Sequence, residues 1–340
     1  MTLKKGYGCA FGGGTIINAV AAWKGCAYAT QLKTYAEVCL NMNRDTVPGS
    51  VSGSVHGSIH ENPSADSKLI ELCVRSVLDQ FDYSETTEAT VLTKSEIPIA
   101  GGLKSSSAAA NATIIAALDA IGEELEPEKI VKLGVGAAKE AGVTITGAYD
   151  DACASFYGGV AATDNKATEL LRRDEFHYDV LILNPGTKAF SSDTNISRSI
   201  LMKDLVETAF EIALSGDYKK AMKLNGLIYC AALGFDPEPA ISCMEIGKDF
   251  DITAGLSGTG PSFTALLPAS ESLSDARRKE LQKVVSEIKQ NWAAQFPNGK
   301  IYETKTSNVG ALEESRRFSE YMKNENMDLK DFVIEKQSLV

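Results

Sequence analysis

The chain has 340 residues, of which 44% are hydrophobic and 23% are charged. This composition is typical of a folded protein and excludes a largely disordered chain, while the length favours two domains over one. The formal net charge of −11 argues against nucleic acid or an acidic membrane as the main partner, because both are bound by a basic face.

The apolar segments and the cysteines favour a cytoplasmic protein. No apolar run reaches the length of a membrane span, and the first residues lack the layout of a secretory signal. The seven cysteines include no C-x-x-C pair, so we expect reduced, buried thiols and no disulfide framework. With only three histidines, a His-rich metal site is not expected.

The first residues predict a β-rich beginning. Residues 6–45 favour strands over 27–32 and 36–41, with a bend at the glycines 12–14 and a short helix over 16–23. The segments expected next are a Gly/Ser-rich surface loop or short strands over 47–60, a helix that opens at Asn62-Pro63, and a strand over 90–94.

Residues 98–110 have the features of an anion-binding loop. They read Pro-Ile-Ala-Gly-Gly-Leu-Lys-Ser-Ser-Ser-Ala-Ala-Ala and lead into an alanine-rich segment, 108–121, that Gly122 closes. Serine is a favoured N-cap and alanine favours helix, so the free amides of the first turn could bind a phosphate oxygen. Gly101 and Gly102 would let the backbone approach the anion closely. A simple glycine turn before a serine-capped helix explains the same residues.

Two adjacent aspartates, Asp150 and Asp151, follow a second predicted helix over 127–140. They open a segment of small residues that ends at two glycines, 158 and 159, and that predicts a short helix. Aspartate is a favoured N-cap, so capping alone would explain one of the two.

A second domain is expected from about residue 175, and it contains another glycine-rich turn. Gly258 and Gly260 flank Thr259 between two strand-like segments and could expose amides to an anion, although a lone G-x-G is weak evidence. The other elements expected here are a strand over 180–183, helices over about 198–214, 217–233, 240–248 and 271–294, and a strand over about 300–306. Residues 311–340 predict a helix, a partner contact or a partly disordered tail.

Together, the three stretches supply what a nucleoside triphosphate and its acceptor require. The phosphates need donors, Mg²⁺ needs oxygen ligands, and the attacking hydroxyl needs a group that receives its proton. No Walker-type loop and no complete G-x-G-x-x-G is present.

These stretches resemble the GHMP kinase superfamily and, within it, the archaeal-type shikimate kinases. The family's pattern, a proline followed by G-L-G-S-S-A-A, corresponds to Pro98 and the segment from Gly102 to Ala108, where Lys104 replaces the usual second glycine. Further matches lie at residues 12–18, 146–152 and 256–262. The resemblance runs from about residue 6 to Gly310.

The resemblance implies an α+β fold of two domains. Residues 1–174 would form a domain like the second domain of ribosomal protein S5 and carry the phosphate loop, and residues 175–310 would form a ferredoxin-like domain. Residues 311–340 would be an extension of unknown role. ATP and its acceptor would meet between the two domains.

The resemblance also implies roles for individual residues. Asp151 would be the catalytic residue that receives the proton of the acceptor hydroxyl, with Asp150 orienting it or sharing its role. Ser106 and Glu140, eleven positions before Asp151, would hold Mg²⁺. The residues that would bind ATP are Gly101, Gly102, Leu103, Lys104, Ser105, Ser106, Ser107, Gly258, Thr259 and Gly260. The alternatives are that Ser107 is only a first-turn residue, that Glu140 is a solvated residue in the last turn of its helix, and that Lys104 is a solvated charge in the loop.

The implied acceptor is shikimate, phosphorylated to shikimate 3-phosphate in aromatic amino-acid biosynthesis. A carboxylate substrate calls for a cationic anchor, for which Lys188 and Arg198 are the candidates, and Thr15 and Asn18 are candidate partners of its hydroxyls. The alternatives are another GHMP kinase, such as a homoserine or mevalonate kinase, or a small-molecule binding protein of the same fold without activity. The oligomeric state cannot be inferred from these residues.

Overall fold

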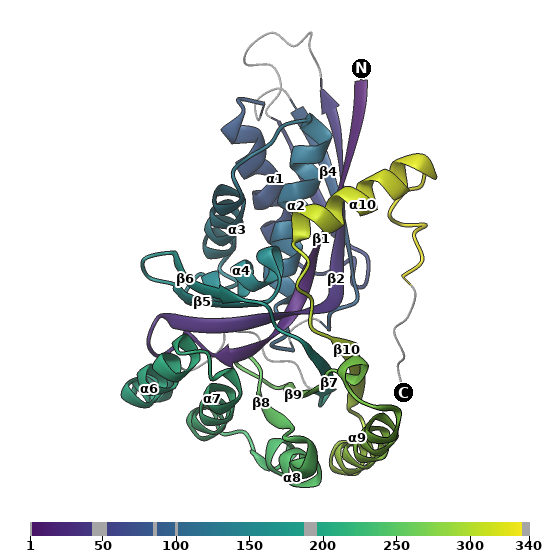
Figure 1. The fold of residues 1–340 in the computed structure, drawn as a ribbon. Helices are drawn as coiled ribbons and strands as arrows, with labels where there is room; N and C mark the ends of the chain where they lie inside the picture. The colour runs from purple at the N-terminus through teal and green to yellow at the C-terminus, as the bar shows by residue number, and fades with distance from the viewer. Residues whose placement is uncertain (1, 43–52, 84–86, 99–100, 187–195, 335–340) are drawn as a thin grey trace.

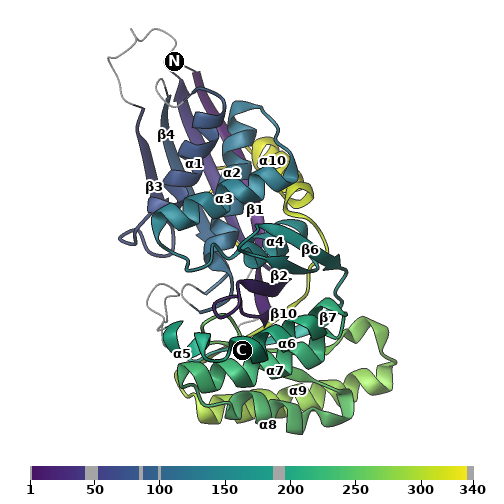
Figure 2. The same cartoon turned by 90° about the vertical axis from the view of Figure 1, so that its left-hand side faces the viewer.

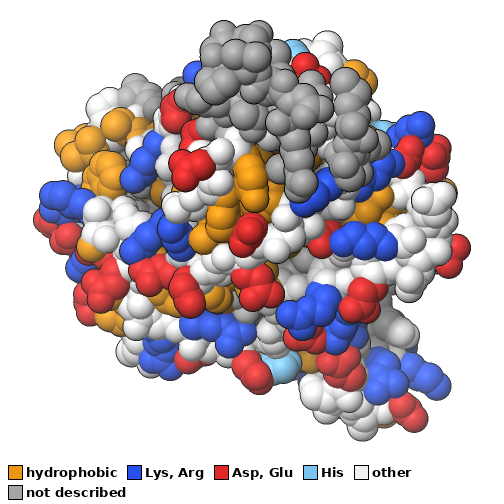
Figure 3. Space-filling model, turned by 90° about the horizontal axis from the view of Figure 1, so that it is seen from above, with side chains coloured by type: hydrophobic (Ala, Val, Ile, Leu, Met, Phe, Trp, Pro, Cys, Tyr) orange, Lys and Arg blue, Asp and Glu red, His pale blue; other side chains and the backbone are white. Residues whose placement is uncertain are grey.

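The computed structural model describes residues 2–42, 53–83, 87–98, 101–186 and 196–334. Figure 1 and Figure 2 show two parts, an upper one with a first sheet and helices α1 to α4, and a lower one with a second sheet and helices α6 to α9. Within these ranges no helix is both long enough and apolar enough to cross a membrane. Acidic and basic side chains are interspersed over the face seen in Figure 3.

The first sheet is organised around one long antiparallel pair, β1 and β2. β1 (Thr2–Ile17) pairs with β2 (Lys24–Met42) along its length. The opposite edge of β2 is shared by two strands, one pairing with each half. In the described part of the chain the other strands of this sheet are β3 (Val55–Ile59), β4 (Thr87–Ser95), β5 (Val160–Asp164) and β6 (Glu169–Asp174).

This pairing corrects three sequence-based expectations. The two strands expected over 27–32 and 36–41 are one strand, which pairs with β1 on both sides of a register shift. The glycines 12–14 lie inside β1, where a register shift replaces the expected bend, and residues 16–23 form the end of that strand and a turn instead of a helix. The β5–β6 hairpin was not expected.

Four helices cover the first sheet: α1 (Lys68–Gln80), α2 (Ser105–Ile121), α3 (Pro127–Ala141) and α4 (Tyr149–Tyr157). α1 begins at Lys68 and not at Asn62-Pro63, which lies in a turn. α2 is almost entirely buried and packs directly on β1. A Cβ at Gly6 or Gly8 would lie 2.2 or 2.3 Å from a carbonyl oxygen of α2, so small residues on both elements allow this close approach.

The second sheet has the order β10-β7-β9-β8 within the described residues. Its strands are β7 (Tyr178–Asn184), β8 (Thr253–Leu256), β9 (Phe263–Pro268) and β10 (Lys300–Lys305). The helices that follow or separate them are α5 (Ile196–Ile200), α6 (Lys203–Leu214), α7 (Tyr218–Leu233), α8 (Glu238–Ile246) and α9 (Asp275–Gln295). β6 ends at Asp174 and β7 begins at Tyr178, and the domain boundary after residue 174 stays a prediction. One apolar cluster nevertheless joins Ile16 and Ile17 of β1 to β7, so the two parts share a core.

The segment after residue 310 returns to the first sheet. α10 (Ala311–Asn324) packs on β1 and lies beside it in Figure 1. Its buried Phe318 and Met322 form a cluster with Tyr7 and Tyr35. The Ser315 hydroxyl lies 2.8 Å from both the N–H and the carbonyl oxygen of Cys9, so α10 supplies partners to an edge strand. The segment, for which no role was inferred from sequence, thus completes the first part.

Replacing Met322, which is fully buried, by alanine should lower the free energy of unfolding by about 2–5 kcal/mol, because the change leaves a cavity under α10. Urea unfolding would measure the effect. The exposed Glu320 on the same helix provides the control, and Glu320→Ala should change stability by less than about 0.5 kcal/mol. Equal stability of the two variants would mean that α10 is not part of the folded core.

Candidate active site

The phosphate loop enters α2 differently from the sequence-based expectation. The N-cap is Lys104, with a left-handed φ of 66° and no side-chain cap hydrogen bond, so no serine caps the helix. The serines form its first turn, and the first bond to the N-cap carbonyl comes from the Ala108 N–H, at 3.0 Å. The N–H groups of residues 105–107 therefore precede the helical ladder and are available to an anion. The side chain of Ser106 is exposed beside them.

The two glycine-rich turns of the sequence are packed against each other. The Ser257 hydroxyl donates to the Gly102 carbonyl oxygen at 2.8 Å. A Cβ at Gly102, whose φ is 74°, would lie 2.2 Å from the Ser257 carbonyl oxygen, so only glycine fits this contact. The Gly13 N–H also donates to the Leu103 carbonyl oxygen, at 3.1 Å. Three segments far apart in sequence thus meet at one loop.

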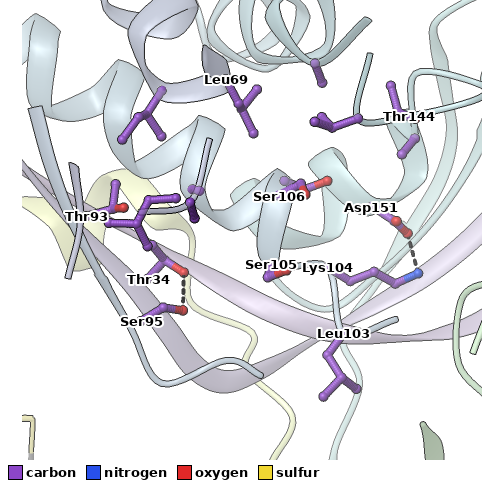
Figure 4. Close-up of a pocket in the computed structure, with 18 of the residues that line it drawn as sticks. Thr34, Leu69, Thr93, Ser95, Leu103, Lys104, Ser105, Ser106, Thr144 and Asp151 are labelled. Atoms are coloured by element: carbon purple, nitrogen blue, oxygen red, sulfur yellow. Dashed lines mark hydrogen bonds and ion pairs between the residues drawn. The ribbon is translucent and has the colours of Figure 1, made fainter. Parts of the chain in front are cut away.

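The side chain of Lys104 reaches an aspartate. Its Nζ lies 2.5 Å from Asp151 Oδ1 and 2.5 Å from Thr15 Oγ1, as Figure 4 shows for the aspartate. Thr15 Oγ1 also accepts the Gly258 N–H at 2.8 Å. Lys104 is only 8% exposed, so its charge is compensated mainly by Asp151. The cation that replaces the usual glycine is therefore bound to the predicted catalytic residue.

The two adjacent aspartates have different environments, although both lie in the first turn of α4. The Asp151 side chain is 20% exposed, whereas Asp150 is only 3% exposed. Asp150 Oδ1 accepts from Asn165 Nδ2 at 2.8 Å. Burial, together with the neighbouring charge of Asp151, raises the pKa of Asp150 to about 7, against the opposing effect of the Lys104 charge.

Two cavities meet at the Lys104–Asp151 pair. The larger has a volume of about 750 Å³ and extends from this pair over the first turn of α2 to β4 and the beginning of α1. The smaller, about 50 Å³, lies toward Asn18, Thr146 and Asp150. The residues that line both are Lys104, Thr144, Ala148, Asp151 and Gly258. The Lys104–Asp151 pair therefore lies in the wall that the two cavities share.

The far end of the larger cavity combines apolar side chains with hydroxyl groups. Leu69 and Thr93 lie there in Figure 4, and Thr34 Oγ1 and Ser95 Oγ are hydrogen-bonded to each other at 2.8 Å. An apolar pocket with a few polar groups is typical of a small-molecule site. Neither hydroxyl was singled out from the sequence, because nothing local distinguishes a strand serine or threonine that lines a pocket from any other.

The predicted site residues fall into three groups. The structure brings together the loop residues 101–107, the two aspartates Asp150 and Asp151, and the turn residues Gly258 and Thr259. Thr15 and Asn18 lie beside them, and Asn18 Nδ2 donates to the Gly258 carbonyl oxygen at 2.7 Å. Gly260 belongs to the same turn. Glu140, exposed in the last turn of α3, and Arg198, exposed on α5, line neither cavity. Lys188 lies outside the described residues.

The described residues contain no group of three or more His, Cys, Asp or Glu side chains placed to hold a metal ion. A magnesium ion bound together with a nucleotide does not require such a group, because it takes one or two carboxylates and completes its ligands with phosphates and water.

Comparison with known proteins assigns this site to a family. A model of the GHMP kinases N terminal domain matches residues 68–159. The chain is 49% identical to a shikimate kinase of Methanosarcina acetivorans over 91% of this chain and 96% of that protein. It is 45% identical to a shikimate kinase of Methanococcoides burtonii over 90% of this chain and 97% of that protein. The chain belongs to the GHMP kinase family, in the group of these shikimate kinases.

Solved structures of GHMP kinases share the fold. A mevalonate kinase of Methanococcus jannaschii superposes with a TM-score of 0.61 at 16% identity, over 90% of this chain and 98% of that one. The galactokinase of Lactococcus lactis in complex with galactose gives 0.64 at 12% identity, over 90% and 94%. The predicted two-domain α+β fold and the prediction of a small-molecule kinase are confirmed. Kinases of this family use ATP and typically Mg²⁺.

The raised pKa of Asp150 predicts a pH-dependent stability. Between the unfolded pKa of about 3.8 and the folded value of about 7, only the folded kinase binds the proton, so stability falls as the pH rises through this range. Asp150→Asn should therefore raise the melting temperature at pH 8 and give a smaller gain at pH 5. Calorimetry at both pH values would measure this, with Asp204→Asn, an exposed first-turn aspartate of α6, as the control. An equal change in the melting temperature of Asp150→Asn at both pH values would contradict the raised pKa of Asp150.

Proposed function

We propose that this kinase transfers the γ-phosphoryl group of ATP to a hydroxyl of shikimate, giving shikimate 3-phosphate. The observation that carries the proposal is the Lys104–Asp151 pair in the wall that the two cavities share. ATP would occupy the larger cavity, and the acceptor would place its reacting hydroxyl in the smaller one, whose volume of about 50 Å³ admits only part of such a molecule. The choice of shikimate follows from relatives that carry this name at 42–49% identity.

The larger cavity fits a nucleoside triphosphate. Its volume of about 750 Å³ lies in the usual range for small-molecule sites, and the free amides of the first turn of α2 open onto it. Ser106 would ligate Mg²⁺ there, whereas Glu140, the other residue expected to hold the ion, lines neither cavity. The bound ion would neutralise the charge of the phosphates. Gly258 and Thr259 would complete the surroundings of the triphosphate.

Asp151 would position the acceptor hydroxyl and receive its proton, which it can do because one carboxylate serves both as a hydrogen-bond acceptor and as a base. The transition state of phosphoryl transfer is loose, so most of the acceleration comes from positioning and charge stabilisation. Lys104 would supply part of this stabilisation. Its ammonium, held by Asp151 and Thr15, lies where the transferred group passes between the cavities.

The carboxylate of the acceptor requires a cationic anchor. Arg198 donates to the Ala231 carbonyl oxygen at 3.1 Å, and neither cavity includes it, so we favour Lys188 as the anchor. Thr15 and Asn18 are already hydrogen-bonded to Gly258, so we assign them a positioning role beside the acceptor.

An assay of ADP release with shikimate, homoserine and mevalonate separates this proposal from its alternatives. Turnover with shikimate alone supports it, and turnover with another of the three would move the chain to a different acceptor. ATP binding without turnover of any of them would favour a binding protein of this fold.

Asp151→Asn should lower kcat by at least about 100-fold, because it removes the group that positions and deprotonates the hydroxyl. Steady-state kinetics would measure kcat, and the ATP Kd and melting temperature would show that the variant is folded. A kcat near the native value would remove Asp151 from the mechanism.

Lys104→Ala should lower kcat by about 100-fold or more while the KM for ATP changes less than about threefold, because in the proposed mechanism the ammonium, held by Asp151 and Thr15, acts on the transferred group and backbone amides hold the ATP phosphates. Lys132→Ala, which removes an exposed lysine of α3, is the control. A tenfold rise in the KM for ATP at native kcat would instead place the Lys104 ammonium on the phosphates.

A further inference from the structure

Asp150 is a buried carboxylate at the active site that the proton transfer does not require. Asp151 alone suffices to receive a proton, yet Asp150 lines the smaller cavity beside it. It is 3% exposed, so water solvates it little.

The surroundings of Asp150 hold its side chain in one place. Asn165, only 1% exposed, donates from Nδ2 to Asp150 Oδ1 at 2.8 Å and accepts the Asp150 N–H at 3.2 Å. The same amide accepts from Thr163 Oγ1 at 2.6 Å and donates to Thr146 Oγ1 at 3.3 Å. On the opposite side, a Cβ at Gly25 would lie 2.4 Å from Asp150 Oδ2, so glycine leaves the room that the carboxylate occupies. Four segments of the chain thus build one rigid carboxyl group.

This arrangement is costly for stability. A second carboxylate beside Asp151 is disfavoured both by loss of hydration and by repulsion, and the neighbouring cation, Lys104, is already paired with Asp151. A favourable interaction with the helix dipole would be available to an exposed aspartate as well. Since an asparagine or serine could hydrogen-bond Asn165 without the charge, the carboxyl group has a use other than folding.

We propose that Asp150 hydrogen-bonds a second hydroxyl of the acceptor, adjacent to the hydroxyl that Asp151 positions, so that the site selects vicinal diols. This inference rests on the proposed function and names the feature of the acceptor that the smaller cavity recognises. Two carboxyl groups from consecutive residues that line one cavity can each bind one of two neighbouring hydroxyls. A carboxyl group can do so as an acceptor when ionised and as a donor when protonated.

The decisive probe is 4-deoxyshikimate, which lacks the hydroxyl next to the phosphorylated one. For the native kinase, kcat/KM should be at least about tenfold lower with this compound than with shikimate, because a site built around a hydroxyl rejects an analogue that lacks it. In Asp150→Ala, kcat/KM should be nearly the same for the two substrates. Asp150→Asn keeps the shape of the side chain and can still hydrogen-bond a hydroxyl, so it should keep part of the discrimination.

Asp151→Asn is the matched control. It should lower kcat with both substrates and leave their kcat/KM ratio unchanged, because it acts on the reacting hydroxyl. Equal kcat/KM of the native kinase for the two compounds would overturn the inference without any variant. If the ratio of kcat/KM for shikimate to kcat/KM for 4-deoxyshikimate in Asp150→Ala equals the native ratio, the inference is also overturned, and Asp150 has a structural role. Absence of turnover with shikimate in the native kinase would instead refute the proposed function, and this inference with it.

Discussion

The active site depends on one buried cation. The Lys104 ammonium would be strongly disfavoured away from water, and its ion pair with Asp151 offsets that cost only while the two groups remain in contact. Lys104 belongs to the loop before α2 and Asp151 to α4, so the pair fixes one helix start against the other. Thr15 of β1 also contacts the Lys104 ammonium, and its hydroxyl oxygen accepts the Gly258 N–H from the turn between β8 and β9. Residues from both parts of the molecule are thereby held around one charge.

The position of this lysine has a conformational cost. A φ of 66° is left-handed, which disfavours a side chain with a Cβ by about 1–2 kcal/mol, and the resemblance to the family leads us to expect glycine here. The strained backbone aims the side chain at Asp151 and away from the free amides of α2. In the proposed mechanism the backbone amides would bind the anion, and the lysine would support the aspartate that positions the acceptor.

The support of the site extends to the end of the chain. Asp119, near the end of α2, accepts hydrogen bonds from the Tyr7 N–H of β1 and from the Ser319 hydroxyl of α10, and it pairs with Lys323. α2 is therefore fixed at its first turn by the site and near its last turn by α10. This gives the C-terminal segment a physical role, since it covers the edge of β1 and restrains the helix that carries the phosphate loop.

The sequence alone determined the features that are set locally. Glycines before a run of serines and alanines predict a loop and a helix, and the boundaries of α3 and β10 came within about a residue of those expected. The family followed from several motifs that occur together, because each of them encodes a contact with the same kind of ligand. Asp151 was predicted to be catalytic from its distance along the chain to a pair of glycines, and its role stays a prediction.

Only the tertiary structure decided what depends on contacts between distant segments. Strand pairing merged two predicted strands into β2, and the β5–β6 hairpin placed Asn165 against Asp150. The partner of Lys104 could not be inferred, because a loop lysine reaches phosphate, water or a carboxylate with the same local sequence. The different burial of Asp150 and Asp151, on which their proposed roles rest, has the same origin. Two identical residues adjacent in sequence differ only in what the rest of the chain packs around them.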